Sequence, residues 1–329
     1  MPGPIVIVAP DPRWPVWFGE ESLPVRDALG KSLHGLEHIG STSVPGLGGK
    51  PTVDMLAGVA GRNEATAALP VLASIGYTDV TPQPEDPDWY YCIGKDGGGT
   101  RRFHLHLARH ASGFWQRHVA FRDFLRAHAA TADEYFELKQ SLAARCRDER
   151  MKYNAAKTGF IRWVETQAAG VRIARMTESD IVAIAGVFER WHKTTRQYEE
   201  YYAEQQQGKR DVFVATLDGK VVGYVTLLTL SRYAPLREQG VPEISDLNVI
   251  NEHQRRGIGS ALVYAAERLA RQRGYAAVGI DVEQSRDYAA AQRLYPQLGF
   301  EPDGRGITPS DNELHLVKPV AAARLSPEQ

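Results

Sequence analysis

The 329-residue sequence has only two cysteines, Cys92 and Cys146, which are too few for a disulfide scaffold or a cysteine-rich zinc module. It has no apolar run near the roughly 20 residues that a membrane-spanning helix needs. Neither sign of charge is in excess, since the formal net charge is -1, so no overall field draws the chain to nucleic acid or to a membrane. The N-terminal residues lack a basic leader and a small-residue cleavage site. We expect a cytoplasmic protein with no nucleic-acid or membrane partner, and the composition leaves its oligomeric state open.

What is present is a globular composition, 43% hydrophobic and 24% charged, in a chain long enough for two domains. Residues 1–100 carry 6 basic and 12 acidic side chains, whereas residues 101–162 carry 13 and 6, so the two segments balance each other. The small, polar stretch 167–170 precedes a strand-like run that begins at Val171. We therefore predict two α/β domains, over residues 1–167 and 171–320.

Apolar periodicity predicts mixed helices and strands in both halves. In the first half it indicates helices over 21–34, 64–75 and from 131 onward, and strands over 52–59, 89–93 and 101–108. In the second half it indicates helices over 177–191, 257–273 and 287–298, and strands over 212–216, 221–228, 243–249, 277–282 and 314–317.

A basic glycine turn, residues 254–260 (QRRGIGS), lies between the predicted strand 243–249 and the helix that follows. Its two glycines let a ligand approach the backbone, and a helix start supplies unpaired N–H groups and partial positive charge. Arg255 and Arg256 add full positive charge. The turn lacks the Lys-Ser/Thr of a P-loop and the third glycine of a dinucleotide turn. This pattern favours the paired phosphates of some other coenzyme, although a Gly-x-Gly before a helix is by itself a weak signal.

The turn resembles the coenzyme-A-binding motif Q/R-x-x-G-x-G/A of the GNAT acetyltransferase family. Residues 291–300 (AQRLYPQLGF) resemble that family's A-x-x-L-Y-x-x-x-G-F segment. The resemblance covers residues 171–318 and implies a GNAT fold with a mixed central sheet, acetyl-CoA as cofactor and N-acetyltransferase activity. One departure is Tyr288, which stands where the family often has an asparagine, so the hydrogen bond ascribed to that asparagine is in doubt.

By the same resemblance, the pantetheine arm of the coenzyme would pair with the backbone of Leu247, Asn248 and Val249. The pyrophosphate would bind backbone N–H groups of the turn, namely those of Arg255, Arg256, Gly257, Ile258, Gly259 and Ser260.

The implied catalytic residues are an acid and a base. Tyr295 would protonate the departing thiolate, because a phenol with a pKa near 10 suits a thiol near 8.5. The base, which would take the proton of an ammonium acceptor, is Asp246 or, as the second candidate, Glu243. Three residues apart on an ideal strand, the two carboxylates would face opposite sides. A buried structural role for Tyr295 and a strand-edge role for Asp246 remain alternatives.

Residues 198–204 (YEEYYAE) combine phenols and carboxylates on a predicted helix. An acidic aromatic rim of this kind would attract a cationic small-molecule amine by charge and cation–π contact. The alternative is a solvated helix whose tyrosines pack inward. The proposed rim consists of Tyr198, Glu200, Tyr201, Tyr202 and Glu204.

In the first half, a loop rich in glycine and hydroxyl groups over residues 38–51 precedes a strand that carries Asp54. Such a loop can surround phosphate oxygens. The loop, residues 103–107 (FHLHL) and the later Tyr153/Lys157/Phe160 pattern resemble the GrpB family, whose fold is similar to that of nucleotidyltransferases. The resemblance covers residues 1–167 and leaves the chemistry of this half open.

Nucleotidyl transfer needs two or three carboxylates around divalent ions. Asp54 would be the first, but Leu56 stands where the second belongs, and His104 and His106 share one face of a neighbouring strand. The alternatives are an anion-binding or structural site, metal-assisted nucleotidyl or phosphoryl transfer, and another hydrolysis. A divalent metal, if bound, would use Asp54, His104 and His106. The full candidate site is Ser41, Lys50, Asp54, His104, His106 and Lys157.

Three functions follow as hypotheses. The first is an acetyl-CoA-dependent N-acetyltransferase that acts on a primary amine by direct transfer in a ternary complex, with a GrpB-like domain that binds substrate or anion. The second is a bifunctional enzyme whose N-terminal domain also performs metal-dependent nucleotidyl or phosphoryl transfer. The third is a non-catalytic, CoA-responsive binding protein.

Overall fold

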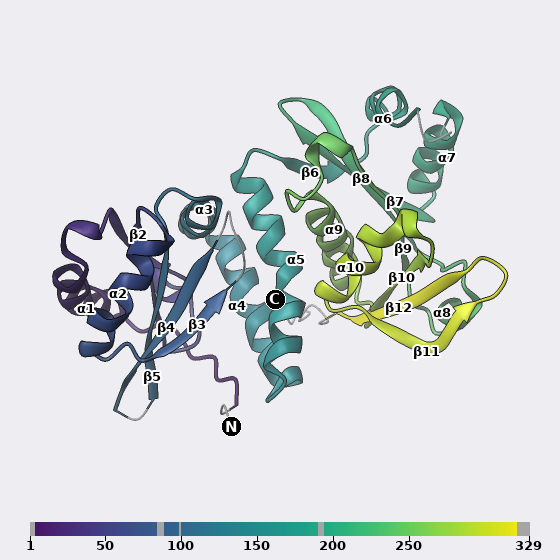
Figure 1. Cartoon of the computed structure of the whole chain (residues 1–329). Helices are drawn as coiled ribbons and strands as arrows, with labels where there is room; N and C mark the ends of the chain where they lie inside the picture. The colour runs from purple at the N-terminus through teal and green to yellow at the C-terminus, as the bar shows by residue number, and fades with distance from the viewer. Residues whose placement is uncertain (1–3, 84–88, 99, 190–193, 321–329) are drawn as a thin grey trace, which may run out of the picture. The chain divides into compact units, whose positions relative to one another are not determined.

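The computed structural model describes residues 4–83, 89–98, 100–189 and 194–320, and forms two compact units, Met1–Asp148 and Glu149–Gln329 (Figure 1). Both units are α/β, which confirms the predicted fold class. Residues 1–3 of the predicted first domain, and residues 190 and 191 of the predicted helix 177–191, lie outside the described part. None of the helices described there combines the length and the apolar character needed to cross a membrane.

The elements of the first unit follow in chain order. They are α1 (Trp14–Leu29), β1 (Gly35–Ile39), the 3-10 turn η2 (Ser41–Ser43), β2 (Val53–Val59), α2 (Arg62–Ser74), β3 (Asp79–Gln83), β4 (Tyr90–Gly97), β5 (Thr100–Arg109), α3 (Gly113–Ala127) and α4 (Ala129–Cys146).

The first unit is built on a five-stranded sheet in the order β1-β2-β5-β4-β3. The interior strand β2 is apolar on both faces, so it is buried on both, with Met55 and Leu56 fully covered. Val53, Met55 and Ala57 pack with the helices α1 and α2, whereas Leu56 packs with Phe114 of α3. β2 and β5 run parallel and place Asp54 opposite His104.

The elements of the second unit also follow in chain order. They are α5 (Arg150–Ala168), β6 (Arg172–Arg175), α6 (Asp180–Phe188), α7 (Thr195–Gln206), β7 (Arg210–Leu217), β8 (Lys220–Leu228), α8 (Ala234–Glu238), β9 (Glu243–Val249), α9 (Ile258–Gln272), β10 (Ala277–Glu283), α10 (Ala289–Gln297), β11 (Glu301–Thr308) and β12 (Glu313–Pro319).

A seven-stranded sheet in the order β11-β12-β10-β9-β8-β7-β6 forms the centre of the second unit. One face packs with α9 and α10 through residues such as Leu262 and Leu298. The opposite face packs with α6 and α7 through Ile184, Tyr198 and Tyr224. The sheet is mixed, since β9 and β10 are parallel while the other pairs are antiparallel.

Two irregularities of β9 open the middle of this sheet. β9 pairs with β10 at Glu243 and Ile244, and no further pair joins the two strands among the described residues. On its other edge, the register with β8 shifts between Ser245 and Asn248, which makes a β-bulge. Asp246 lies in this bulge with a φ of 53°, a left-handed backbone that is uncommon outside glycine.

Candidate active site

The basic turn leads into α9 through a left-handed backbone. Arg255 and Gly257 have φ values of 59° and 87°, and Gly257 is the N-cap residue of the helix. The first amides of a helix have no hydrogen-bond partner within the helix, and glycine has no side chain that could accept from them. Successive amides in such a turn form a concave anion-binding site. The exposed Arg255 and Arg256 add two cations to the same turn.

Gly259 lies where three elements of the site meet. A Cβ atom placed on Gly259 would lie 3.7 Å from Leu294 of α10 and 3.8 Å from both Leu247 and Val249 of β9. These are ordinary van der Waals distances, so the protein itself leaves room for a side chain here. The first turn of α9 thus faces the end of β9 that has diverged from β10, which is where the predicted coenzyme residues are brought together.

A hydrogen-bonded network surrounds Asp246. Its Oδ2 atom accepts from the Tyr224 hydroxyl at 2.8 Å and from the Tyr201 hydroxyl at 3.1 Å, and its Oδ1 accepts from Asn248 Nδ2 at 2.9 Å. Burial and the Asp246 charge raise the pKa of Tyr201 above its ordinary value. Both phenols are therefore protonated donors, and both carboxylate oxygens are engaged. The roles of the Tyr224 and Asn248 side chains in this network were not predicted, because they depend on the bulge.

The prediction that Glu243 and Asp246 face opposite sides is wrong. Glu243 pairs opposite Leu228, which shares a face of β8 with Tyr224, and the Tyr224 hydroxyl bonds Asp246. The extra residue of the bulge resets the alternation of side chains along β9. Both carboxylates therefore lie on the face of the sheet that carries α7.

Two further carboxylates lie near Glu243, and neither of them was predicted. Burial, and then the charge of Glu243, raise the pKa of Asp281 on β10 to about 6. Burial, and then the charges of Asp281 and Asp311, raise the pKa of Glu313 on β12 to about 7. The β10–β12 register pairs Asp281 with His315 and Glu283 with Glu313, which makes Asp281 and Glu313 diagonal neighbours on one face of the sheet. This carboxylate cluster (Glu243, Asp281 and Glu313) could not be found from sequence, because the pairing of β9, β10 and β12 assembles it.

The segment before β9 holds Glu243 in place. Ser231 Oγ and the Arg232 amide both donate to Glu243 Oε2, and the carboxylate is 4% exposed. Next to them the Tyr233 ring stacks on His315 of β12, with the ring centroids 3.6 Å apart. This segment leads into the short helix α8 and bonds directly to Glu243.

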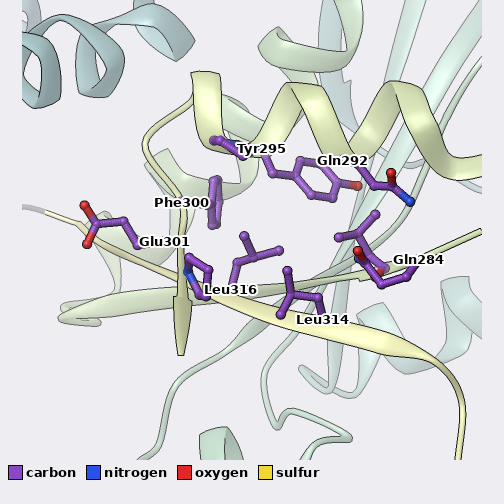
Figure 2. A pocket seen from close by; sticks show the side chains of 10 residues that line it. Gln284, Gln292, Tyr295, Phe300, Glu301, Leu314 and Leu316 are labelled. Atoms are coloured by element: carbon purple, nitrogen blue, oxygen red, sulfur yellow. The ribbon is translucent and has the colours of Figure 1, made fainter. Parts of the chain in front are cut away.

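Tyr295 lies on α10 and is 6% exposed. Burial, and then the charge of Asp281, raise the pKa of its phenol well above the ordinary value, so the hydroxyl is protonated at neutral pH. Figure 2 shows its ring over a cavity of about 380 Å³, with Gln292 near the hydroxyl and Phe300 on the other side. The cavity is lined by Val282, Gln284, Gln292, Tyr295, Pro296, Phe300, Glu301, Pro302, Leu314 and Leu316.

The tyrosines of the predicted acceptor rim pack toward the core, and its two glutamates form ion pairs. Tyr198 is fully buried, and its hydroxyl lies 3.4 Å from that of Tyr224. The Tyr201 hydroxyl donates to Asp246. Tyr202 is partly buried and packs against the hydrophobic core that contains the other two tyrosines. Glu200 forms an ion pair with Arg196 at 3.0 Å, and Glu204 with Arg210 at 2.6 Å. The two carboxylates are thus compensated by arginines of this unit.

In the first unit, Asp54 lies beside two histidines. Its Oδ1 atom accepts from His104 Nδ1 at 3.3 Å and lies 3.6 Å from His106 Nε2. Burial alone would raise the pKa of Asp54, but the interactions with these two histidines outweigh it and hold the pKa below its usual range. A Cβ atom on Gly40, which has a φ of 71°, would lie 2.5 Å from Asp54 Oδ2, so only glycine fits there.

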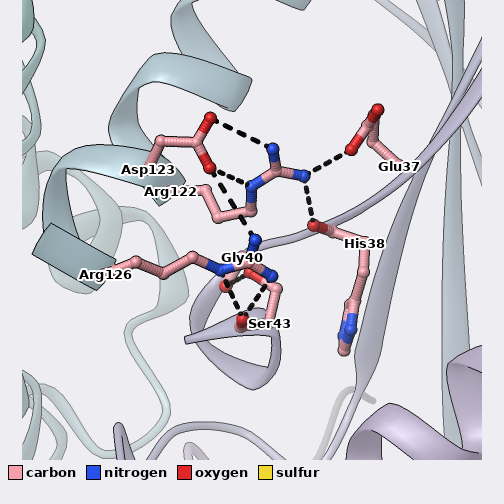
Figure 3. A network of polar contacts seen from close by, with 7 residues as sticks. All are labelled: Glu37, His38, Gly40, Ser43, Arg122, Asp123 and Arg126. Carbon is pink, nitrogen blue, oxygen red and sulfur yellow. Dashed lines mark hydrogen bonds and ion pairs between the residues drawn. The ribbon is translucent and has the colours of Figure 1, made fainter. Parts of the chain in front are cut away.

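Three cations from α3 and α4 hold residues 38–48 through carbonyl groups, and Figure 3 shows two of them, Arg122 and Arg126. Arg122 donates to the His38 carbonyl at 3.1 Å, and Arg126 to that of Ser43 at 2.8 Å. Lys139, buried on α4, donates to Ser41 Oγ at 2.7 Å and to the Gly48 carbonyl. The Ser41 hydroxyl is therefore engaged within the unit.

The remaining predicted residues of this half lie elsewhere. Lys50 precedes β2, and its carbonyl accepts from the Thr52 amide at 2.8 Å. Lys157 lies on α5, which belongs to the second unit, with its ammonium 4.4 Å from the Tyr153 ring centroid. Within the described residues, no group of three or more His, Cys, Asp and Glu side chains is arranged to hold a metal ion.

The fold and these sites define a two-domain α/β protein whose second unit has the layout of an acyltransferase. Residues 4–167 match the model of the GrpB protein family, and residues 179–300 match the Acetyltransferase (GNAT) family. The chain belongs to the GrpB family and carries a domain that matches the acetyltransferase (GNAT) family. Both predicted resemblances are thereby confirmed.

Similar proteins match one half or the other. A UPF0157 protein of Halalkalibacterium halodurans is 34% identical over 164 residues, which are 50% of this chain and 82% of that protein. The human N-acetyltransferase 8B is 38% identical over 95 residues, covering 29% of this chain and 40% of its own length. The crystal structure of GrpB from Enterococcus faecalis is 31% identical, with a TM-score of 0.45, over 50% of this chain and 96% of its own.

Proposed function

We propose that the second unit transfers the acetyl group of acetyl-CoA to a primary amine of a small cationic molecule, directly and in a ternary complex. The GrpB domain would bind substrate or an anion. The observation that carries the proposal is the opening between β9 and β10 beyond Ile244. The first turn of α9 lies on one face of this opening, and the carboxylate cluster lies on the other.

The coenzyme would lie along the diverged end of β9. Its thioester would pair with backbone groups of Leu247 and Asn248, and its pyrophosphate would bind the amides from Gly257 to Ser260. The Val249 carbonyl already accepts from Gln254 Nε2 at 3.0 Å, which braces the strand end. Gly259 supports this placement, because the room beside it is not needed by the protein itself.

The carboxylate cluster supports a cationic acceptor. At neutral pH Glu313 is near its midpoint and Asp281 is largely ionised, so an arriving ammonium finds negative charge in a partly buried site. Groups with pKa values near the working pH also make effective proton acceptors. We infer that the proton of the ammonium passes to this cluster through Glu243, while Asp246, whose oxygens are already engaged, positions Tyr201 and Tyr224.

The chemical step then balances within the complex. The neutral amine attacks the thioester carbonyl, an N–C bond forms, and the C–S bond breaks. The amine's remaining extra proton goes to the carboxylate cluster, and Tyr295 donates a proton to the departing thiolate. One of the two protons taken from the amine then restores the Tyr295 hydroxyl through solvent, and the other is released. Direct transfer is further supported by the positions of Cys92 and Cys146, since both lie outside the second unit.

The test is release of CoA thiol, with mass detection of product, from the full chain and a panel of charged and uncharged amines. We expect turnover of cationic amines, and at least a tenfold loss of kcat/KM in Glu313→Gln. The exposed Glu178→Gln serves as the control with unchanged kinetics. Equal turnover of uncharged amines by the wild type and Glu313→Gln would contradict the cationic acceptor, and no turnover of any amine would contradict the transferase.

A further inference from the structure

The helix α5 ends the segment that matches the GrpB family, yet it packs inside the acyltransferase unit. The family match runs to residue 167, whereas the compact second unit begins at Glu149. α5 buries Tyr153, Gly159, Phe160 and Val164. It is therefore a structural part of the transferase, although its sequence is that of the other family.

The packing partner of α5 is the coenzyme helix α9. Tyr264 of α9 is 1% exposed, and its ring lies edge-on to Phe160 at 5.5 Å and 6.0 Å from Trp163. Gly159 permits this approach, because a Cβ atom there would lie 3.3 Å from the Tyr264 ring. The face of α9 turned away from the sheet is thus covered by α5, so the orientation of α9 depends on this helix.

At the N-terminal end of α9, α5 brings Arg162 to the basic turn. The Arg162 Cδ atom lies 3.4 Å from the position of a Cβ on Gly257, and Thr166 Cγ2 lies at 3.9 Å. The Arg162 side chain is 41% exposed, and its Nη1 donates to Glu165 at 2.7 Å. A guanidinium has five N–H donors, so this ion pair leaves donors for another acceptor.

We propose that Arg162 is a coenzyme-binding residue that donates from its guanidinium to a phosphate group of the bound acyl-CoA. Arg255 and Arg256 directly precede Gly257 in the chain and are exposed, so Arg162 is a third arginine at this turn. Arginine binds phosphate through paired, charge-assisted hydrogen bonds. The proposal rests on the proposed function, because it assumes that the coenzyme's phosphates bind at this turn. It means that the GrpB-family segment contributes directly to the affinity of the acyltransferase for its coenzyme.

The experiment is titration calorimetry of the full chain with CoA and with 3′-dephospho-CoA. Arg162→Ala should weaken CoA binding about tenfold, the size expected for one charge-assisted contact, and Arg162→Lys should recover part of the loss. Arg150→Ala, an exposed arginine on the same helix, is the matched control and should bind as the wild type does. If the loss is absent with 3′-dephospho-CoA, the contact is to the 3′-phosphate, and if it persists, the contact is to the pyrophosphate.

Thermal unfolding of each variant separates a binding role from a structural one. Equal CoA affinity of Arg162→Ala and Arg150→Ala would overturn the assignment of Arg162 while leaving the proposed function in place. A lower melting temperature of Arg162→Ala with unchanged CoA affinity would likewise overturn it. Absence of CoA binding to the wild-type chain would overturn both.

Discussion

Phe160 of α5 lies edge-on to Tyr264 of α9, with their ring planes at 87° and both side chains buried. This contact joins α5, which lies in the segment that matches the GrpB family, to α9, which lies in the segment that matches the GNAT family. The two family segments therefore cannot be separated after residue 167 without cost, because such a cut would expose both rings to water.

Removing the Phe160 ring should destabilise the second unit. Phe160→Ala leaves a cavity against Tyr264, and such truncations of buried aromatic residues lower the free energy of unfolding by about 3–5 kcal/mol. Denaturant unfolding, followed by tryptophan fluorescence, measures the change. Met151→Ala, an 87% exposed residue of the same helix, is the control. A loss below about 1 kcal/mol in Phe160→Ala would show that α5 is not an integral part of the unit.

Binding of a cation at the carboxylate cluster should weaken as the pH falls. Glu313 and Asp281 have pKa values raised to about 7 and about 6, so both are charged at pH 8 and mostly neutral at pH 5. A quaternary ammonium inhibitor keeps its own charge, and we expect its Ki to rise about tenfold over this range. Glu313→Gln should remove the change in Ki near pH 7, where Glu313 itself titrates. A Ki that does not depend on pH would place the acceptor elsewhere.

Replacing Tyr295 should affect the chemical step and not coenzyme binding. Tyr295→Phe removes the donor for the thiolate, and loss of one acid or base costs roughly 10²-fold or more in kcat. The Kd for acetyl-CoA should stay within about twofold. Tyr275→Phe, a partly buried tyrosine that packs against the same core, is the control. Unchanged kcat in Tyr295→Phe would give this tyrosine a structural role.

In the first unit, Asp54→Asn should lower stability at neutral pH. The carboxylate accepts from His104 and lies 3.6 Å from His106 Nε2, and losing such an acceptor costs about 1–3 kcal/mol. Because its pKa is lowered in the folded state, this contribution is present above the unfolded value near 4 and is lost as the pH falls through the folded value. Urea unfolding should therefore separate the wild type from Asp54→Asn at pH 7 and less so below pH 3, with the exposed Asp27→Asn as control. Equal stability at pH 7 would contradict a paired Asp54.

The sequence predicted the elements that local patterns define. The strand that begins at Glu243, the helix after Gly257 and the helix that carries Tyr295 were placed within a few residues, because periodicity and turn glycines mark them. The strand β1, the helix α3 and the strand β11 were missed.

The rest of the site depends on tertiary pairing that one sequence does not encode locally. The bulge that turns Asp246 toward Tyr224 arises from the register between β8 and β9. Asp281 and Glu313 come together only when β12 pairs beside β10. The docking of α5 on α9 was also missed. The apolar face that carries Phe160 predicts that α5 is buried on that side, but not which element covers it.

The most direct test of the central claim is titration of acetyl-CoA into the full chain and its Gly259→Ala variant. A Cβ at this position meets no described atom closer than 3.7 Å in the protein, so the variant should melt at or slightly above the wild-type temperature. We predict saturable binding to the wild type, and binding at least tenfold weaker to Gly259→Ala, because the added methyl group occupies the path of the coenzyme. Absence of heat with the wild type, or equal affinity of the two proteins, would contradict the account.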